Sequence, residues 1–328
     1  MIDLQMIRDA QSRIGGHIIS TPTEPSSSLS ELFQVPIVLK HEHLQKTGSF
    51  KLRGATNAIL QLSDAEKATG VIAVSTGNHG RALAHAARAV GSKATICMSE
   101  LVPQNKVSEI RRLGADVRII GQSQDEALHE VDRLVTEHEL VEIPPFDHPD
   151  IIAGQGTIGL DIIEALPNVE TVLVPVSGGG LAAGIAVAVK SLLPNAKIIG
   201  VSMERGAAMK ASLTAGKPIQ VEERRSFADA LGGGIGLDNN LTLRLCQQLL
   251  DDVILLTEEE IAAGIRYAYH EEREVLEGSG AVGIAALISG KIGHLSGPVA
   301  VVLSGRNIAM DLHRQILNGK IDPNQEAF

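Results

Sequence analysis

Lys51 is the residue of this chain that is best suited to covalent chemistry. It lies in the run Ser49–Arg53, where Thr47, Gly48 and Ser49 predict a turn and a helix cap. A cation in the first turn of a helix is disfavoured by the helix dipole, and burial would lower the pKa of the amine further. Because a neutral amine can attack an aldehyde, Lys51 is a candidate nucleophile. The alternative is an exposed lysine near a helix start.

A glycine loop follows the apolar run 172–176 and opens an alanine-rich helix. The loop consists of Ser177, Gly178, Gly179, Gly180 and Leu181. Glycines let backbone N–H groups converge on an anion, and a helix N-terminus adds its dipole, so the loop predicts a phosphate site. A nicotinamide dinucleotide site is the alternative, because Gly178, Gly180 and Ala183 also satisfy G-x-G-x-x-A. Glu204 then ends the next strand about where a ribose-binding acid would lie.

A polar loop and a late serine complete the set of candidate residues. Residues 75–80 join a predicted strand to a helix, and the simple interpretation is a capped turn with Asn78 as N-cap. Ser304 ends the apolar run Val299–Leu303, where a serine is commonly a cap. A lysine for an aldehyde, a glycine loop for a phosphate, amides at a helix start and a serine after a strand would together hold pyridoxal phosphate.

Strands and helices alternate along the chain, which is typical of parallel sheets with crossover helices. The predicted strands are 35–40, 71–75, 94–97, 116–120, 171–176, 197–203 and 299–303. The predicted helices are 50–62, 79–90, 103–113, 123–138, 153–165, 182–193, 258–272 and 281–288. The proline-rich run 144–149 interrupts the alternation and predicts a return crossing between two domains.

The composition limits the classes of partner. Hydrophobic residues make up 44% of the 328 residues, aromatic residues only 2%, and the net charge is −10. Nucleic acids and anionic membranes require basic surface, so neither is expected as a partner. Cys97 and Cys246 lie in apolar stretches and are expected to be buried structural thiols. With no signal segment and no membrane-length apolar run, the sequence predicts a soluble cytoplasmic protein.

In this order the motifs resemble the fold-type-II pyridoxal-phosphate enzymes, on the serine/threonine dehydratase and serine racemase branch. The resemblance covers almost the whole chain and rests on four motifs: Ser49–Ala55, Thr76–Gly80, Ser177–Leu181 and Ser304–Asn307. It implies a two-domain α/β fold like that of the tryptophan synthase β chain, with parallel sheets covered by helices. The large cofactor-binding domain would comprise 1–65 and 148–328, and the small substrate-capping domain 66–147.

The resemblance also implies a role for each candidate residue. Lys51 would bind the aldehyde of pyridoxal phosphate and act as base, Phe50 would lie against its ring, and the glycine loop would hold its phosphate. Asn78 would bond the ring hydroxyl, Ser304 the pyridine nitrogen, and Glu277 would lie near the ring or be a solvated helix-end carboxylate. The loop that would hold the substrate carboxylate consists of Ser75, Thr76, Gly77, Asn78 and His79.

Within that loop, Thr76 stands where serine racemases carry an acid/base serine. His79 is expected to be structural rather than catalytic. The family pattern Gly154–Thr157 is expected to shape the mouth of the active site.

Two departures from the family pattern affect the expectations. Related racemases bind a divalent ion through carboxylates at positions that here are Ser202 and Ala208, so no metal is predicted there. Arg306 replaces the usual glycine of S-G-G-N, and we expect it either to meet an anionic group of the substrate or to turn to solvent. Arg306 and its neighbouring motifs look like the dehydratases of hydroxyectoine breakdown.

The expected function is a pyridoxal-phosphate-dependent dehydratase, or ammonia-lyase. It would convert a β-hydroxy amino acid such as L-threonine or L-serine to a 2-oxo acid and ammonia. The alternatives are a hydroxylated amino acid of hydroxyectoine catabolism as substrate, an amino-acid racemase, and a nicotinamide-dependent oxidoreductase. A homodimer or homotetramer is expected.

Overall fold

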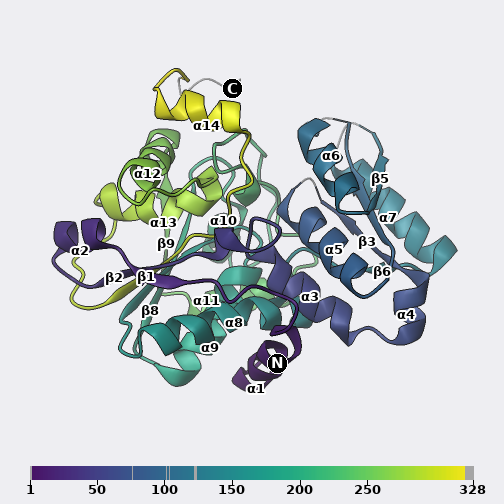
Figure 1. Cartoon of the computed structure of the whole chain (residues 1–328), viewed down its shortest axis with the longest axis horizontal. Helices are drawn as coiled ribbons and strands as arrows, with labels where there is room; N and C mark the ends of the chain where they lie inside the picture. The colour runs from purple at the N-terminus through teal and green to yellow at the C-terminus, as the bar shows by residue number, and fades with distance from the viewer. Residues whose placement is uncertain (1, 76, 101, 103, 122–123, 322–328) are drawn as a thin grey trace.

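The chain folds around two sheets, each flanked by helices (Figure 1). The computed structural model describes residues 2–321 apart from 76, 101, 103 and 122–123, and it does not describe the side chains of 104–105 and 124–125. The first and last described helices, Leu4–Ile14 and Met310–Leu317, lie at opposite sides of the molecule in the view of Figure 1. Within the described residues no helix is long and apolar enough to cross a membrane.

The larger sheet has six strands, and all neighbouring pairs are parallel except the edge pair β1–β2. Its order is β1 (Thr23–Pro25), β2 (Ile37–Lys40), β10 (Val299–Val302), β7 (Thr171–Pro175), β8 (Lys197–Met203) and β9 (Asp252–Leu256). The central strands β10 and β7 are buried along their whole length, as continuous apolar runs covered on both faces should be.

The smaller sheet has four parallel strands. Its order is β5 (Asp116–Ile119), β4 (Ala94–Met98), β3 (Val71–Val74) and β6 (Val141–Glu142). These strands all fall inside the predicted interval 66–147, while the domain boundary itself stays a prediction. Helix α3 (Lys51–Gln61) contributes Leu52 and Ile59 to the core of this sheet, so its first turn joins the two parts of the molecule.

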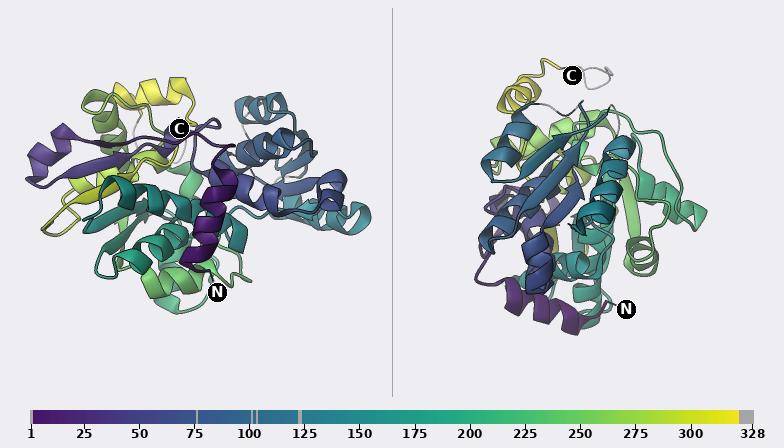
Figure 2. Two further views of the ribbon diagram at one scale, coloured as in Figure 1. Left: turned by 60° about the horizontal axis from the view of Figure 1, so that its bottom comes forward. Right: turned by 90° about the vertical axis from the view of Figure 1, so that its right-hand side faces the viewer.

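The other helices cover the faces of the two sheets (Figures 1 and 2). Around the smaller sheet lie α4 (Asp64–Thr69), α5 (Asn78–Ala89), α6 (Gln104–Arg112) and α7 (Gln124–His138). The remainder of the chain forms α1 (Leu4–Ile14), α2 (Ser27–Phe33), α8 (Pro149–Ala165), α9 (Gly180–Leu192), α10 (Ala208–Ala215), α11 (Thr242–Leu249), α12 (Glu258–His270), α13 (Gly278–Ile288) and α14 (Met310–Leu317). Two short 3₁₀ helices are η1 (Glu42–Leu44) and η2 (Asp229–Leu231).

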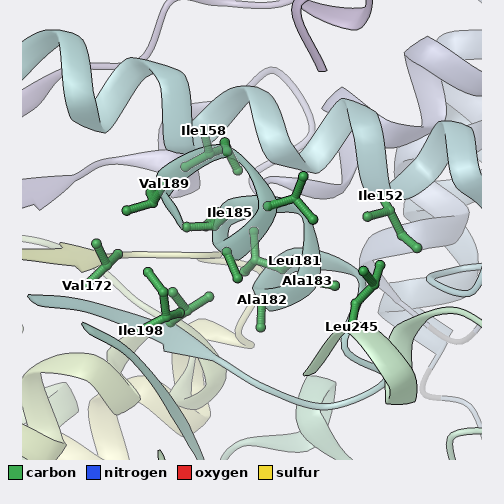
Figure 3. Packing of buried hydrophobic residues seen from close by; sticks show 14 of the residues in the cluster. Ile152, Ile158, Val172, Leu181, Ala182, Ala183, Ile185, Val189, Ile198 and Leu245 are labelled. Atoms are coloured by element: carbon green, nitrogen blue, oxygen red, sulfur yellow. The ribbon is translucent and has the colours of Figure 1, made fainter. Parts of the chain in front are cut away.

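Small residues allow the central helices to approach very closely. Helix α9 is buried from Gly180 to Val189 and packs between α8 and the strands of the larger sheet (Figure 3). A Cβ added to Gly184 would lie 2.4 Å from the carbonyl oxygen of Ile152, and one added to Gly154 would lie 2.7 Å from the Cα of Gly54. Such contacts leave no space for a side chain, so backbone packs against backbone here.

The motif 154–157 therefore has a different role from the one expected. These residues lie in the interior of α8, and all four are buried between α3 and α9 instead of lining an active-site mouth. Helix α8 also begins at Pro149, four residues before the predicted start at Ala153. His148 caps it, because its side chain accepts a hydrogen bond from the Asp150 N–H, and a proline is well tolerated in the first turn.

A buried charge network connects the first strands with α3 and α8. Arg53 donates to both carboxylate oxygens of Glu42 at 2.8 and 2.9 Å and to Asp161 at 2.6 Å. Lys40 lies 2.9 Å from the same Asp161. Burial alone would lower the pKa of Arg53, but the charges of Glu42 and Asp161 raise it well above its usual value. Losing one member of a buried pair typically costs about 3–5 kcal/mol, so this network fixes the base of the Lys51 helix.

Candidate functional site

The candidate residues meet where parallel strands end. Because β10 and β7 are parallel neighbours, their carboxyl ends bring Ser304 and the glycine loop to the same edge of the sheet. Ser49 pairs with Gly305 in an isolated bridge, and the Phe50 N–H donates to the Ser304 carbonyl at 3.0 Å. The first turn of α3 is therefore held against the end of β10, which places Lys51 at this edge.

The Lys51 amine lies in a largely apolar setting. Its Nζ donates to the carbonyl oxygen of Pro145 at 2.7 Å and lies 5.3 Å from the centroid of the Phe50 ring. Burial lowers the pKa of Lys51 to about 8, so a substantial fraction of the amine is neutral near that pH. This agrees with the expectation of a nucleophilic amine.

The expected helix cap before Lys51 is wrong. Phe50 occupies the N-cap position of α3, and no side chain caps the helix. The Ser49 hydroxyl is buried and has no partner among the described residues. The predicted turn is present, since Gly48 adopts a φ of 78°, and a Cβ there would lie 2.4 Å from Asn307 Oδ1.

The glycine loop forms a tightly packed turn before α9. Gly179 has a φ of 88°, which only glycine adopts readily. A Cβ at Gly178 would lie 2.2 Å from the ring of Phe146, and one at Gly180 would lie 3.0 Å from the Phe146 backbone. The loop is buried apart from half-buried Ser177, and its backbone leads into the N-terminus of a 13-residue helix. This arrangement suits an anion such as phosphate.

The crossing segment 144–148 belongs to the site, which the sequence analysis did not anticipate. Pro145 accepts the bond from Lys51, and the next residue, Phe146, packs on the glycine loop. Asp147 accepts three backbone hydrogen bonds, from Asn240, Leu241 and Thr242, at 2.9, 3.1 and 2.7 Å. The sequence Pro-Pro-Phe-Asp at 144–147 could have indicated this role, because prolines restrict the backbone and so can hold the neighbouring side chains in fixed positions.

Asn78, Glu277 and Asn307 form a connected polar group, which Asn307 links to the turn before Lys51 by donating to the Thr47 carbonyl at 2.9 Å. Asn78 Nδ2 donates to Glu277 Oε1 at 2.6 Å, and Asn78 Oδ1 accepts from Asn307 Nδ2 at 2.6 Å. The Asn307 N–H donates to Glu277 Oε2 at 3.0 Å. Asn78 is not an N-cap: Gly77 holds that position, and Asn78 is the first residue of α5.

Glu277 is a buried carboxyl, not a solvated one. Its side chain is 4% exposed, and a Cβ on Gly305 would lie 2.2 Å from its Oε1. Burial, together with the charge of Asp229, raises the pKa of Glu277 to about 7, although the hydrogen bonds from Asn78 and Asn307 and the charge of Lys106 oppose the rise. Glu277 thus changes protonation near neutral pH.

The loop 75–79 is organised around its first serine. Ser75 Oγ accepts the N–H groups of Gly80 at 2.8 Å and Gly77 at 3.3 Å. His79 is buried, with Nε2 2.8 Å from the Ile143 carbonyl oxygen. Burial, then the charge of Lys51, lowers the pKa of His79 to about 3, so this ring stays neutral, in agreement with a structural role. Thr76 lies outside the described residues.

After β10, Ser304 points into the interior of the protein, whereas Arg306, two residues later, is exposed. Ser304 is buried, and its hydroxyl donates to the carbonyl oxygen of Ser279 at 3.2 Å. Arg306 is exposed, while its backbone N–H donates to the Gly48 carbonyl at 2.9 Å. Arg306 therefore lies at the rim and not in the interior.

The end of β8 offers little to a hard cation. Ser202 and Ala208 are both buried, and Ala208 starts α10. Glu204 faces Lys291, with 3.5 Å between Oε1 and Nζ. Cys97 and Cys246 are free and buried, as expected, and burial raises the pKa of their thiols to about 11 and 12.

The site fits a small aldehyde that carries a phosphate. A lysine of lowered pKa, a glycine loop with no room for side chains, and buried hydroxyls without a partner among the described residues all lie at one edge. Those hydroxyls belong to Thr47, Ser49 and Ser279. A profile of the family described as "Pyridoxal-phosphate dependent enzyme" matches residues 14–305. The chain belongs to this family.

Relatives in the family agree over nearly the full length. A Sinorhizobium fredii protein named "Putative threonine dehydratase" is 64% identical over 99% of this chain and 98% of its own. The L-threonine ammonia-lyase of Thermotoga maritima is 42% identical over 100% of this chain and 81% of its own. The enzyme class and the pyridoxal-phosphate cofactor are thus as predicted, and the dinucleotide interpretation of the glycine loop is wrong.

Solved structures in the family share the architecture. Maize serine racemase superimposes with a TM-score of 0.91 at 31% identity, covering 97% of this chain and 98% of its own. The processed form of threonine deaminase isoform 2 from Solanum lycopersicum gives 0.88 at 36% identity, covering 96% and 92%. The predicted fold-type-II α/β fold is confirmed.

Proposed function

We propose that this protein is a dehydratase that converts L-threonine to 2-oxobutanoate and ammonia, with L-serine as a second substrate giving pyruvate. The observation that carries the proposal is the Lys51 amine, with its pKa lowered to about 8, beside the glycine loop. The names of the two sequence relatives, threonine dehydratase and threonine ammonia-lyase, support the reaction and the substrate class.

The residues that would hold pyridoxal phosphate follow from the geometry and from the family. Lys51 would bind the aldehyde, the backbone of 177–181 the phosphate, and Ser304 the ring nitrogen. Asn78 Nδ2 carries two hydrogens, and within the described residues one of them goes to Glu277, so the second would be available for the ring hydroxyl. When bound, the cofactor withdraws electrons from the α-carbon of an amino acid and so makes its α-hydrogen acidic.

Lys51 would then act as the base. The Lys51 amine, whose pKa burial lowers to about 8, would be available as a neutral base to accept the α-proton of the substrate. Loss of the α-proton and of the β-hydroxyl together amounts to one water. The resulting enamine would then tautomerise, take up one water and release ammonia, which leaves the 2-oxo acid. His79, with a pKa of about 3, stays neutral and cannot supply protons at neutral pH.

The substrate carboxylate would bind at the start of α5. The first N–H groups of a helix have no partner within the helix, and a helix N-terminus favours an anion. Ser75 occupies the N–H groups of Gly77 and Gly80, which leaves those of Asn78 and His79 for the carboxylate. The sequence placed Thr76 in this loop as well, and its role remains a proposal.

Arg306 would select for substrates with an additional anionic group. Because it is exposed, an ion pair with such a group is expected to contribute only about 0.2–1 kcal/mol. Arg306→Gly should therefore lower kcat/KM for β-hydroxy amino acids with a second carboxylate by at most about 5-fold and leave threonine unaffected. Equal losses on both substrates would show that Arg306 has a structural role instead.

The deciding experiment is a turnover screen of β-hydroxy amino acids with the holoenzyme. Release of 2-oxobutanoate and ammonia in equal amounts from L-threonine, absent in Lys51→Ala, is the expected result. A second candidate, serine racemase activity, is favoured by the likeness to the maize enzyme. Chiral analysis that finds D-serine without pyruvate would replace the dehydratase with a racemase. A homodimer or homotetramer in the cytoplasm is part of the proposal, and light scattering after gel filtration tests the assembly.

A further inference from the structure

Three side chains away from the glycine loop converge at the carboxyl end of β2. His41 and His43 flank Glu42, and Glu274 lies in the segment between α12 and α13. His41 Nδ1 is 3.1 Å from Glu274 Oε1, and His43 Nε2 is 2.7 Å from Glu274 Oε2. One carboxylate thus faces two imidazoles, and a ligand atom of each residue lies within 4.8 Å of those of the other two.

Both imidazoles are buried, and three of their four ring nitrogens have no hydrogen-bond partner among the described residues. The side chain of His41 is 7% exposed and that of His43 is 1% exposed. Neither ring nitrogen of His41 makes a hydrogen bond within the described residues, and nor does His43 Nδ1. His41 Nδ1 contacts Glu274 Oε1 at 3.1 Å without meeting the geometry of a full hydrogen bond. A hydrogen-bonded bridge through Glu274 therefore accounts for His43 and leaves His41 unexplained, since buried polar atoms are nearly always paired.

We propose that His41, His43 and Glu274 bind a divalent transition-metal ion, with Zn²⁺ as the best match. Two imidazole nitrogens and one carboxylate are ligands that zinc takes readily, whereas Mg²⁺ and Ca²⁺ prefer oxygen alone. Glu274 is 21% exposed, which leaves a route for the ion and a fourth position for water.

The observed spacing needs little change to accept the ion. With bonds of about 2.0–2.1 Å, ligand atoms at the corners of a tetrahedron lie roughly 3.4 Å apart. The two observed separations run to different oxygens of Glu274, 3.1 Å to Oε1 and 2.7 Å to Oε2, and the ligand atoms of the three residues lie within 4.8 Å of one another. The carboxylate and the rings would therefore adjust to bring one atom of each residue to the ion. A modest rotation of the His41 ring would aim its Nδ1 at the same point.

The ion would hold together two segments that lead into the cofactor site. The His43 N–H donates to the Leu303 carbonyl at 2.9 Å, and Leu303 precedes Ser304. Glu274 stands three residues before Glu277. The site is therefore a stabilising one, separate from the strand end at Ser202.

Zinc binding to the untagged holoenzyme tests the proposal. The protein is first chelated and desalted, and Zn²⁺ is then added back. Calorimetric titration and elemental analysis of the reloaded protein should find one Zn²⁺ per chain, and saturating Zn²⁺ should raise Tm by roughly 3–5 °C. Glu274→Gln and His43→Gln should each weaken binding at least about 10- to 100-fold, the range that loss of an outer partner already costs. His294→Ala, which removes an exposed histidine, is the matched control and should bind as the wild type does.

Two results would overturn the proposal. The first is equal zinc affinity in the wild type and in both ligand variants, or no bound zinc at all. The second needs no variant, in case the substitutions prevent folding: X-ray absorption at the zinc edge of the wild-type protein should report two imidazole ligands, and fewer than two excludes this site.

Discussion

At the scale of single residues, the chemistry depends on Lys51. Removing its amine removes both the covalent attachment of the cofactor and the base, so Lys51→Ala should lower turnover at least about 1,000-fold. Borohydride reduction of the wild-type holoenzyme, followed by peptide mapping, should label Lys51 with the cofactor. Label on any other lysine would show that the residue has been misassigned.

Glu277 should make the stability of the protein depend on pH. Its pKa is about 7 in the folded state and 4.5 as a free side chain, so the folded state binds more protons between these values. The stabilisation is complete below pH 4.5 and is lost as the pH rises through 7. Glu277→Gln has no charge to bury. Between pH 5 and pH 8 its free energy of unfolding should therefore fall by about 2–3 kcal/mol less than that of the wild type.

Urea denaturation at the two pH values measures this difference. The variant at exposed Glu271, Glu271→Gln, is the control and should follow the wild type. The same pH dependence in Glu277→Gln as in the wild type would mean that another group titrates.

At the scale of elements, the end of β8 sets the response to chelators. Ser202 and Ala208 occupy the ligand positions, and Glu204 is turned towards Lys291. We therefore expect EDTA to leave the turnover of the folded holoenzyme nearly unchanged, even where it lowers Tm through the histidine site. Loss of turnover that Mg²⁺ alone restores would contradict this reading of β8.

The packing of α9 on α8 predicts an unusual sensitivity to one methyl group. A Cβ at Gly184 would meet the backbone at 2.4 and 2.6 Å, so Gly184→Ala should destabilise the protein by about 1–3 kcal/mol through overpacking. Gly16 has no atom within 4 Å of its added Cβ, and Gly16→Ala is the matched control. Thermal denaturation compares them, and similar Tm values for the two variants would contradict the packing argument.

Strands and helices with a strong apolar period could be predicted from the sequence. Strand β8 was predicted with its observed bounds, and α3, α5, β7 and β10 to within one or two residues. Elements whose burial depends on distant partners were not predicted. The short edge strand β1 pairs only with β2, and α11 is capped by Asp147 from far along the chain, so neither carries a local signal.

At the scale of the whole molecule, the site could be predicted only in part. Lys51, the glycine loop and Ser304 lie at chain positions where local sequence dictates a helix start or a strand end. Glu277 was left undecided, because its burial depends on Asn78 and Gly305 from two other segments. The pair of histidines around Glu42 was overlooked, although the spacing His-x-His is visible, because the partner Glu274 is more than 200 residues away.

The order of strands in the larger sheet also governs how the protein is made. Strand β10, ending at Val302, lies between β2 from the start of the chain and β7 from its middle. The smaller sheet is continuous in sequence, from Val71 to Glu142, and can form while synthesis continues. The larger sheet stays open at its centre until residues 299–302 have left the ribosome. A chain that lacks β10 would expose unpaired backbone N–H and C=O groups along the edges of β2 and β7 and would also lack Ser304, so the full cofactor site can form only after β10 has been made.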